Sequence, residues 1–494
     1  MSLLPSIHDK DESFNDGLKW AAIVGTLVLL PLIVFFQHFL GTLRGATLSR
    51  PLNEISASEV ARDPEISGLI LTSKSVLKEV YFTIESVWED VSETGAPLGR
   101  HAEIEGLQAA VAELDAMALS RVDRLRVAMV VGELQGPEAA LERVQQVKRE
   151  AMDGGALSIE AHTLERYYAA AAMGQDAPIE PDAAAALIAR HGWFGRLATT
   201  FDDPPGSADR EYTLGGYGAL VGFLAVQTLL GFLAFVAGLG AFALLVYRMR
   251  TGLTTFRILE TGVPRIIMLE TFACFLFAFF LVLIGGVLFI GSTSLTSVII
   301  SEMLMWSCGL ALLWPLARGV SWSDVCDELG LSRGEGIHKE LFAGVLGYLA
   351  GLPLILVVSL IAVATERAIT GEEVGPEGFP MFETPLAGSW AGLMIGAVGA
   401  CLWAPLVEEA LFRGALHSYL PAWMGVLGRC LLVGAIFGLI HPYSPAGMIQ
   451  VGAAGVVLGF LREWRGSLIA PITAHFLHNA TITATTIAIV SMLD

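Results

Sequence analysis

Charged residues are scarce in this sequence, and basic residues are scarcer than acidic ones. Only 16% of the 494 residues are charged, whereas soluble domains carry about 25%. The 30 Lys and Arg residues are outnumbered by 49 Asp and Glu, which leaves a formal net charge of −19. Proteins that bind nucleic acid need a basic surface, so this balance argues against nucleic acid as a partner.

Cysteines are also few, and they show no CxxC spacing. The five of them lie mostly in apolar stretches, at Cys274, Cys308, Cys326, Cys401 and Cys430. The long polar region 41–212 contains none. This absence excludes a disulfide framework in that region, whatever compartment it occupies.

Long apolar runs take the place of the missing charges. Hydrophobic residues make up 54% of the chain, and the mean hydropathy is +0.62. A helix needs about 20 apolar residues to cross a bilayer core of about 30 Å. Nine segments approach this length, at 20–40, 214–247, 266–291, 295–317, 341–364, 386–406, 425–441, 446–461 and 467–492. The sequence therefore predicts an all-α fold: a polytopic transmembrane helical bundle of about eight core helices plus an N-terminal anchor helix, with a helical soluble insertion domain.

The first apolar run, Trp20 to Leu40, is interrupted only by Gln37 and His38. It is too long for the apolar core of a signal peptide, and no Ala-x-Ala cleavage site follows it, so we expect an uncleaved anchor. The predicted organisation has four parts: a tail and transmembrane anchor at 1–40, a soluble acidic domain at 41–212, accessory transmembrane helices at 213–340, and a C-terminal bundle at 341–494.

The polar region 41–212 has the periodicity of short amphipathic helices. Apolar residues recur at three- and four-residue spacing, as in Val80, Ile84 and Val87, in Leu107, Val111 and Leu114, and in Leu141, Val144 and Val147. Gly- and Pro-containing pairs separate these groups as turns. We expect an array of short helices facing water, which either shields or regulates the membrane part or binds a protein partner.

Lys and Arg concentrate in alternate connections between the predicted spans, which is a bias that marks the cytoplasmic side. One set of connections is basic and contains Arg248, Arg250, Arg257, Arg265, Arg318, Arg333, Lys339, Arg462 and Arg465. The connections 292–296, 365–385 and 442–447 hold only Arg367. The Ala- and Gly-rich, acidic composition favours a bacterial source. We therefore expect a multi-pass protein of the bacterial inner membrane, with its N-terminus cytoplasmic and residues 41–212 extracytoplasmic.

Two adjacent carboxylates interrupt the apolar C-terminal part, within Pro405–Gly414. Ionisable groups inside a membrane cost roughly 2.5–3.5 kcal/mol each on insertion scales, so they usually mark a function. Glu409 and Arg413 are four residues apart, so on a helix they face and partly neutralise each other. Glu408 lies on another side of the helix, which leaves its charge without a local partner.

Two further polar insertions follow, Phe437 to His441 and His475 to Asn479, and in each the first and last residues share a helix face. A helix rise of about 1.5 Å per residue places Glu408, His441 and His475 at about 12–18 Å from the nearest expected interface. Because 425–441 is short for a span, it and 446–461 are expected to form a hairpin whose tip ends within the membrane. Such a tip must line a cavity, so the polar groups are expected to converge on one wet pocket.

These residue types suit hydrolysis. A carboxylate beside an imidazole can deprotonate a water molecule, or it can hold a divalent metal ion that does so. A second imidazole followed by a carboxamide can donate hydrogen bonds to an oxyanion. Zinc would suit Glu408, His441 and His475 as ligands, although the sequence lacks an HExxH helix. The sequence leaves the choice between metal-bound and metal-free water open.

The three insertions together resemble the motifs of the CAAX protease and bacteriocin-processing (CPBP, or Abi) family of intramembrane proteases. That family carries Glu-Glu-x-x-x-Arg, Phe-x-x-x-His and His-x-x-x-Asn or Asp, which here are Glu408 to Arg413, Phe437 to His441 and His475 to Asn479. The resemblance covers about 340–492. It implies that the 341–494 bundle is the core of an intramembrane endopeptidase acting on a peptide or membrane-bound protein substrate.

The resemblance also implies a role for each motif residue. Glu408 would be the base that activates water, and His441 would assist it. His475 and Asn479 would stabilise the oxyanion, while Glu409 and Arg413 would organise the site. The family includes proteins described as metalloproteases, and a mechanism with carboxylate-activated water and no metal has also been argued for it.

Two other functions are compatible with the sequence. One is a non-catalytic scaffold or bacteriocin-immunity protein that uses 41–212 to bind a partner. The other is a transporter that uses Glu270 or Glu302 on an ion pathway, although neither has a basic or His partner at helical spacing. We expect no role in the site for His478, which is on a different helix face from His475, or for His417, which is expected near the membrane interface.

Overall fold

The computed structural model describes residues 7–47, 111–112, 114–115, 118, 120–150, 155–175, 178–201, 203, 207–214, 217–253, 256, 263–288, 295–370 and 390–493. The described secondary structure is entirely helical, as predicted. The chain divides into two compact units. The first, here called the membrane unit, comprises Met1–Leu48, Gln227–Thr384 and Trp390–Thr486; the second, the helical unit, comprises Ser49–Val226, Pro385–Ser389 and Ile487–Asp494.

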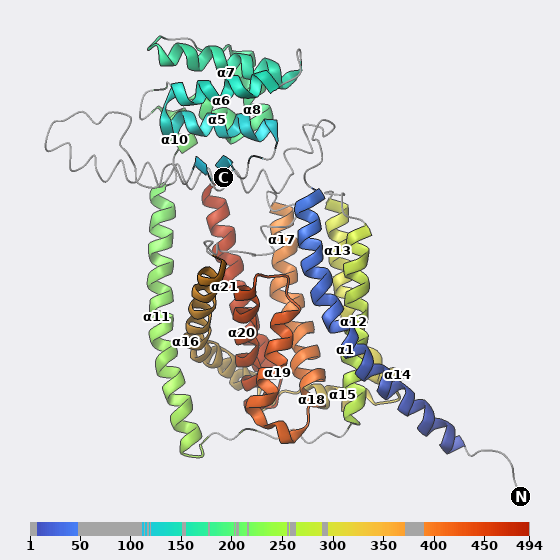
Figure 1. Cartoon of the computed structure of the whole chain (residues 1–494). Coiled ribbons are helices and arrows are strands. Elements are labelled where there is room, and N and C mark those ends of the chain that lie inside the picture. Colours follow the sequence, from blue (N-terminus) through green and yellow to red (C-terminus); the bar gives the residue numbers. More distant parts are fainter. Residues whose placement is uncertain are drawn as a thin grey trace, which may run out of the picture. The chain divides into compact units, whose positions relative to one another are not determined.

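Long apolar helices make up the membrane unit, where they run alongside one another as a bundle (Figure 1). Its helices include α1 (Ile7–Thr47), α11 (Tyr217–Arg250, from Gln227 onward), α12 (Arg265–Leu288), α13 (Leu295–Ser307), η1 (Cys308–Leu313), α14 (Trp314–Ala317), α15 (Trp322–Leu329), α16 (Ile337–Thr370) and α17 (Trp390–Val398). They continue with η2 (Gly399–Glu408), η3 (Ala410–Leu416), α18 (His417–Tyr419), η4 (Ala422–Met424), α19 (Gly425–Leu439), α20 (Pro445–Arg465) and α21 (Ile469–Leu493). Eight helical segments among the described residues are long and apolar enough to cross a membrane, which confirms a polytopic bundle.

The N-terminal helix is a packed member of this bundle. Ala22 and Ile33 of α1 are buried in a core cluster that includes Phe272 and Phe275 of α12. Leu27, on another face of α1, keeps 69% of its surface exposed, as expected for a side chain that contacts lipid. The predicted anchor therefore also contributes to the core that surrounds the C-terminal motifs.

Glycines let α16 approach α20 and α21 closely. A Cβ at Gly344 would lie 2.6 Å from the Ala470 carbonyl oxygen, and one at Gly351 would lie 2.6 Å from Val457. Small residues at such positions allow backbones to pack tightly inside a membrane. As a result, α16 forms a wall behind the two C-terminal helices.

The predicted helical hairpin is present, with α19 packed along α20. Its first helix has only 15 residues, about 22 Å of rise, which is shorter than a bilayer core. The second helix begins at Pro445, and the side chain of Ser444 caps it by accepting a hydrogen bond from the Gly447 amide. Pro at the first helical position costs no hydrogen bond, because that amide would have no partner within the helix.

The segment that carries the paired glutamates departs from the α-helix assumed from the sequence. Residues Gly399–Glu408 and Ala410–Leu416 are π-helical, a geometry in which a carbonyl group accepts from the amide five residues ahead instead of four. Pro405 lies inside the first of these segments and has no amide hydrogen to donate. The wider turn still brings Glu409 and Arg413 together, but the relative directions expected from 3.6 residues per turn do not apply.

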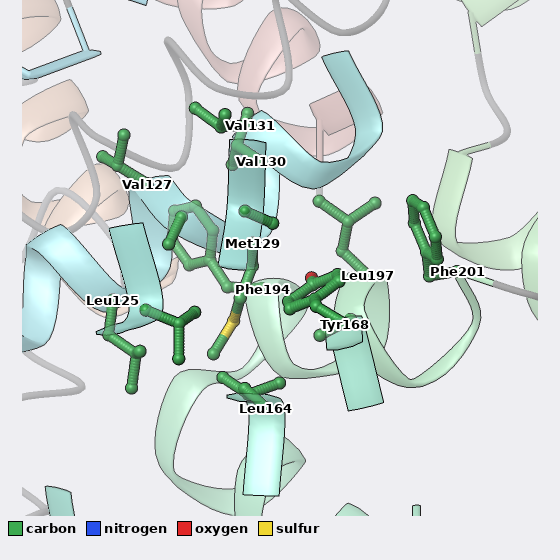
Figure 2. Packing of buried hydrophobic residues seen from close by; sticks show 14 of the residues in the cluster. Leu125, Val127, Met129, Val130, Val131, Leu164, Tyr168, Phe194, Leu197 and Phe201 are labelled. Atoms are coloured by element: carbon green, nitrogen blue, oxygen red, sulfur yellow. The ribbon is translucent and has the colours of Figure 1, made fainter. Parts of the chain in front are cut away.

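The helical unit contains α5 (Arg121–Gln135), α6 (Pro137–Glu150), α7 (Ala156–Ala172), α8 (Pro181–His191), α9 (Trp193–Thr199), α10 (Ala208–Leu214) and the first part of α11. Its apolar core collects side chains from α5, α7 and α9 (Figure 2). Val144 and Val147 are buried as their spacing predicted. The expected positions Val80, Ile84, Val87 and Leu107 lie outside the described residues.

Side-chain caps and ion pairs fix the helices of this unit. Ser120 and Asp123 form a reciprocal capping box at the start of α5, an arrangement worth about 1 kcal/mol. Arg210 joins α10 to α5 through two hydrogen bonds to Glu133, with nitrogen–oxygen distances of 3.0 and 2.8 Å. The array of short helices expected for this region is therefore present in its described part.

Acid should loosen the helical unit through His191. Its side chain is fully buried beside Glu160, at 3.2 Å from Nε2 to Oε2, and desolvation lowers the pKa of the imidazole, although the Glu160 carboxylate opposes this effect. The unfolded chain, with a His pKa of about 6.5, then binds the proton more readily. The stability that comes from burying His191 in its neutral form is therefore present above pH 6.5. It is lost as the pH falls from the pKa of the unfolded chain toward the lower pKa of the folded one.

We therefore expect faster hydrogen exchange in α8 at pH 5.5 than at pH 7.5 in the full-length protein, after correction for intrinsic rates. His191→Gln should remove most of this pH dependence, whereas His162→Gln, at a position with 58% side-chain exposure, should keep it. An equal pH dependence in His191→Gln and the wild-type protein would contradict this assignment.

Candidate active site

A pocket of about 400 Å³ lies within the membrane unit, between the π-helical segment η2 and helices α13, α16, α19, α20 and α21. Four of the six predicted site residues line it: Glu408, His441, His475 and Asn479. These residues come from three separate sequence motifs, so the fold brings together the groups that the sequence predicted to converge. Glu409 and Arg413 are fully buried and do not line the pocket.

Glu409 lies at the centre of a buried charge network behind the pocket wall. Its Oε1 accepts hydrogen bonds from Arg413 Nη1 and from His475 Nδ1, both at 2.8 Å. Arg413 also donates from Nη2 to the Gly455 carbonyl at 3.0 Å. Because a carboxylate beside a guanidinium can only accept, His475 carries its proton on Nδ1 and directs Nε2 elsewhere. The network therefore fixes the orientation of the His475 ring.

A backbone carbonyl fixes the second imidazole. His441 Nδ1 lies 2.6 Å from the Phe437 carbonyl oxygen, which only accepts hydrogen bonds, so Nδ1 carries the proton. The Phe437 ring lies between the two histidines, with its centroid 4.8 Å from that of His441 and 6.0 Å from that of His475. The guanidinium of Arg413 lies over the same ring, at 4.3 Å. In both imidazoles, Nε2 remains for chemistry in the pocket.

Residues outside the three motifs hold the hairpin that carries His441. Gln37 of α1 donates from Nε2 to the carbonyl of Ile440 at 2.7 Å, directly before His441. Glu366 of α16 accepts hydrogen bonds from the amide of Ala446 at 2.7 Å and from Ser444 Oγ at 3.3 Å. Sequence analysis missed both, because each acts on a backbone group far away in the chain. The sequence feature that could have pointed to Gln37 and Glu366 is that each is a polar residue within an apolar segment.

Replacing Gln37 by Leu should loosen this hairpin. The change leaves the buried carbonyl of Ile440 without its donor, which costs about 1–3 kcal/mol. We expect the melting temperature of the detergent-solubilised protein to fall by a few degrees, measured against Leu27→Val on an exposed face of the same helix. Equal melting temperatures for the two variants would show that the Gln37 contact does not hold the hairpin.

Asn479 compensates for the gap that Pro405 leaves in the π-helix. In a π-helix the carbonyl of Ala400 would accept from the amide of residue 405, which as proline has no hydrogen. Asn479 Nδ2 donates to this carbonyl instead, at 2.7 Å. One amide hydrogen of Asn479 is thus used to hold η2 against α21, and the other remains for the oxyanion role that the motif implies.

Glu408 differs from its neighbour Glu409 in both exposure and partners. Its side chain is half-buried and lines the pocket, and no described residue donates a hydrogen bond to it. Glu409, in contrast, is wholly buried and bonded to the side chains of Arg413 and His475. The adjacent carboxylates therefore differ in position: Glu408 faces the pocket, whereas Glu409 fixes the orientation of His475 from behind the pocket wall.

The expected metal ligands meet only part of the requirement for a metal site. Metal-binding histidines usually donate one ring N–H to a carboxylate or carbonyl, as His475 and His441 do here. Among the described residues, however, no group of three His, Cys, Asp or Glu side chains is placed to hold a metal ion. Zinc binding by Glu408, His441 and His475 stays a prediction, and the mechanism below uses only groups of the chain.

The structure changes the interpretation of two histidines. His478, expected to have no role, lines the pocket, and its ring packs edge-on to Tyr348 at 6.1 Å. His417, expected near the membrane interface, is fully buried and bonded to Glu463 at 2.8 Å, and Arg429 lies 2.6 Å from the same carboxylate oxygen. This buried cluster joins α18, α19 and α20. Pairwise spacing could not reveal it, because its members come from separate helices.

Glu270, one of the two carboxylates considered for a transporter, has a structural role instead. Glu270 forms an ion pair with Arg318 at 2.9 Å and accepts a hydrogen bond from Trp314 Nε1 at the same distance. It joins α12 to the turn after α14 and does not line the pocket. Glu302, the second residue considered for an ion pathway, lines the same pocket as Glu408.

Comparisons with known proteins relate the region of the three motifs to a protein family. Residues 390–481 match the family described as "Type II CAAX prenyl endopeptidase Rce1-like". Over 76 residues the chain is 37% identical to the uncharacterized protein YpbD of Bacillus subtilis strain 168. That match covers 15% of this chain and 36% of the relative, so the chain spans about a third of its length. No solved structure matches the chain.

The matched segment contains η2, η3, α19, α20 and most of α21, and therefore all three motifs. Helices α1, α13 and α16, which supply Gln37, Glu302 and Glu366, lie outside it. The family resemblance inferred from the motifs is confirmed: residues 390–481 of this membrane protein match the family model of type II CAAX prenyl endopeptidase, Rce1-like proteins, consistent with the CAAX intramembrane protease family.

Proposed function

We propose that this protein is an intramembrane endopeptidase that hydrolyses a peptide bond within or next to the membrane by means of a glutamate-activated water molecule. One observation carries the proposal: Glu408 forms no hydrogen bond or ion pair with a described residue, and it lines a pocket that it shares with His441 and His475. Both rings have Nδ1 committed to an acceptor, which leaves Nε2 of each available. Unpaired carboxylates at membrane depth are costly, so such a group calls for a functional explanation.

In the first step, Glu408 accepts a proton from water while His441 Nε2 accepts a hydrogen bond from the other water hydrogen. The water oxygen forms a bond to the carbonyl carbon of the substrate, and the carbonyl π pair moves to its oxygen. This use of two acceptors orients the nucleophile as well as activating it. The fixed Nδ1 proton of His441 supports this role, because it leaves Nε2 of the neutral ring with a lone pair.

The oxyanion is then stabilised from the α21 side. His475 in its imidazolium form donates from Nε2, and the Glu409 carboxylate at Nδ1 stabilises that cation. The second amide hydrogen of Asn479 is a further donor, since the first is held by Ala400. Donors fixed in advance at a developing charge typically contribute about 10²–10³-fold to the rate. When the carbon–nitrogen bond breaks, Glu408 returns its proton to the leaving amine.

The test is cleavage of a membrane-peptide library by the purified protein in lipid nanodiscs, read by mass spectrometry, with wild type compared with Glu408→Gln. Each protein is assayed with and without a chelator. We expect cleavage by the wild-type protein that Glu408→Gln abolishes. Cleavage that persists with chelator supports water activated by the carboxylate alone, whereas loss restored by added zinc supports a metal held by Glu408, His441 and His475.

A non-catalytic scaffold is the alternative that this assay must exclude. Absence of cleavage by the wild-type protein would contradict the proposal if deleting 41–212 removed the protein's cellular phenotype while Glu408→Gln and His441→Ala preserved it. That pattern would assign function to the helical unit as a surface for a protein partner. The cytoplasmic placement of the N-terminus stays a prediction from the Lys and Arg distribution.

A further inference from the structure

Glu302 is a carboxylate in the pocket that the family motifs do not include. It is the one charged residue between Leu295 and Leu313, a stretch that belongs to a candidate span, Ile299–Ala317. Its helix, α13, lies outside the residues matched by the Rce1-like family. Retaining a carboxylate there costs roughly 2.5–3.5 kcal/mol on insertion scales, so it needs a compensating interaction.

That compensation does not come from the described part of the protein. No described residue forms a hydrogen bond or ion pair with Glu302. Four other carboxylates of the membrane unit pair with arginines, namely Glu270, Glu340, Glu409 and Glu463. Glu302 instead lines the pocket together with Glu408.

The approach of Glu302 to the pocket wall is close and defined. A Cβ added at Gly399 would lie 3.1 Å from Glu302 Oε2, so the carboxylate rests against the first residue of η2. Glu408 is the last residue of the same segment. A π-helix rises less per residue than the about 1.5 Å of an α-helix, so the two ends of η2 lie no more than about 13 Å apart. An extended peptide spans that distance in at most about four residues.

The Glu302 end of the pocket suits a positive charge. The residues that line the pocket include the carboxylates Glu302 and Glu408 and the imidazoles of His441, His475 and His478, but no Lys or Arg. Aromatic rings of Tyr348, Trp403 and Tyr443 also line the pocket, and such rings attract cations through their faces. An alkylammonium or guanidinium group would therefore find an opposite charge at Glu302 and aromatic rings in the same pocket.

We propose that Glu302 forms a substrate subsite that binds a cationic group of the peptide, a Lys or Arg side chain or a free N-terminal amine, within about four residues of the cleaved bond. This inference rests on the proposed endopeptidase function. It narrows the substrate class to peptides that carry a positive charge at one fixed distance from the scissile bond, and it gives α13 a part in recognition.

The test places Lys, or its neutral isostere norleucine, at each of four positions on either side of the bond in an otherwise apolar peptide. We expect Lys at one position to raise kcat/KM by about tenfold or more over norleucine in the wild type, as expected for a desolvated charge pair. The same ratio should hold in Asp327→Asn, which removes one exposed charge elsewhere. It should fall to near one in Glu302→Gln. An unchanged ratio in Glu302→Gln would overturn the subsite.

Binding separates failure of the subsite from failure of the proposed function. In Glu408→Gln protein, which should not cleave, the Lys peptide should bind about tenfold more tightly than the norleucine peptide. Adding Glu302→Gln should remove this difference. Equal affinities of the two peptides in the presence of Glu302, together with no effect of N-terminal acetylation on either affinity, would contradict the subsite even if no peptide is ever cleaved. N-terminal acetylation distinguishes the two sources of charge. If the amine is the ligand, acetylation should weaken binding of the norleucine peptide about tenfold in Glu408→Gln but not in the double variant with Glu302→Gln; if a side chain is the ligand, acetylation should leave the preference for Lys unchanged.

Discussion

Glu408→Gln should lower the rate of peptide cleavage by at least about 10³-fold, because a positioned general base typically contributes 10²–10⁴-fold. The amide keeps the size of the side chain but cannot accept a proton from water. Because Glu408 lies at the pocket and no described residue bonds to it, its neutralisation should leave the packing intact. The measurements are single-turnover cleavage in nanodiscs and the melting temperature of the same preparation.

The matched control is Asp327→Asn, a change of the same kind at an exposed position of α15. It should cleave at the wild-type rate. His441→Ala should retain slow cleavage, since it removes one of the two acceptors that orient the water. A Glu408→Gln protein that cleaves within a few-fold of wild type would refute the role of this carboxylate, and a large drop in its melting temperature would show that the residue acts in the fold instead.

Arg413→Met should destabilise the membrane unit more than any other change considered. Arg413 is wholly buried and donates to Glu409 and to the Gly455 carbonyl. Removing one partner of a buried ion pair costs about 3–5 kcal/mol, because it leaves the other charge uncompensated. We expect a fall in melting temperature on the order of 10 °C, measured in one detergent for all variants.

A double variant separates the cost of the stranded charge from the loss of packing. In Glu409→Gln with Arg413→Met, no carboxylate remains at 409, so much of the lost stability should return. Cleavage should not return, because the ring of His475 then lacks the charged partner that orients it. If the double variant is as unstable as Arg413→Met alone, the unpaired charge is not the cause of the instability.

Much of the fold follows from hydrophobic patterning. Uncharged runs of about 20 residues predict membrane helices directly, because a bilayer leaves the backbone few alternatives. The short run 425–441 similarly predicted the hairpin of α19 and α20. The π-helical geometry of η2 and η3 could not be predicted, because it depends on Pro405 together with Asn479, which is 74 residues further along the chain.

Prediction of the site succeeded where residues lie four apart and failed where contacts cross the bundle. Helical spacing placed Arg413 against Glu409 and His441 against Phe437, as the structure has them. Gln37 and Glu366 were not predicted to act at the site, and Glu302 was considered only for an ion pathway, since each comes from a helix distant in sequence and carries no motif. Their positions at the pocket and the hairpin follow only from the packing of α1, α13 and α16 around the motif helices.

The central claim is that Glu408 activates a water molecule that cleaves a peptide bond. The most direct measurement is cleavage in H₂¹⁸O by the wild-type protein and by Glu408→Gln in nanodiscs, with mass spectrometry of the new C-terminus. The account predicts one ¹⁸O atom in the new carboxylate of the wild-type product and no product from the variant. Cleavage at the wild-type rate by Glu408→Gln, or a product whose new C-terminus lacks ¹⁸O, would contradict it.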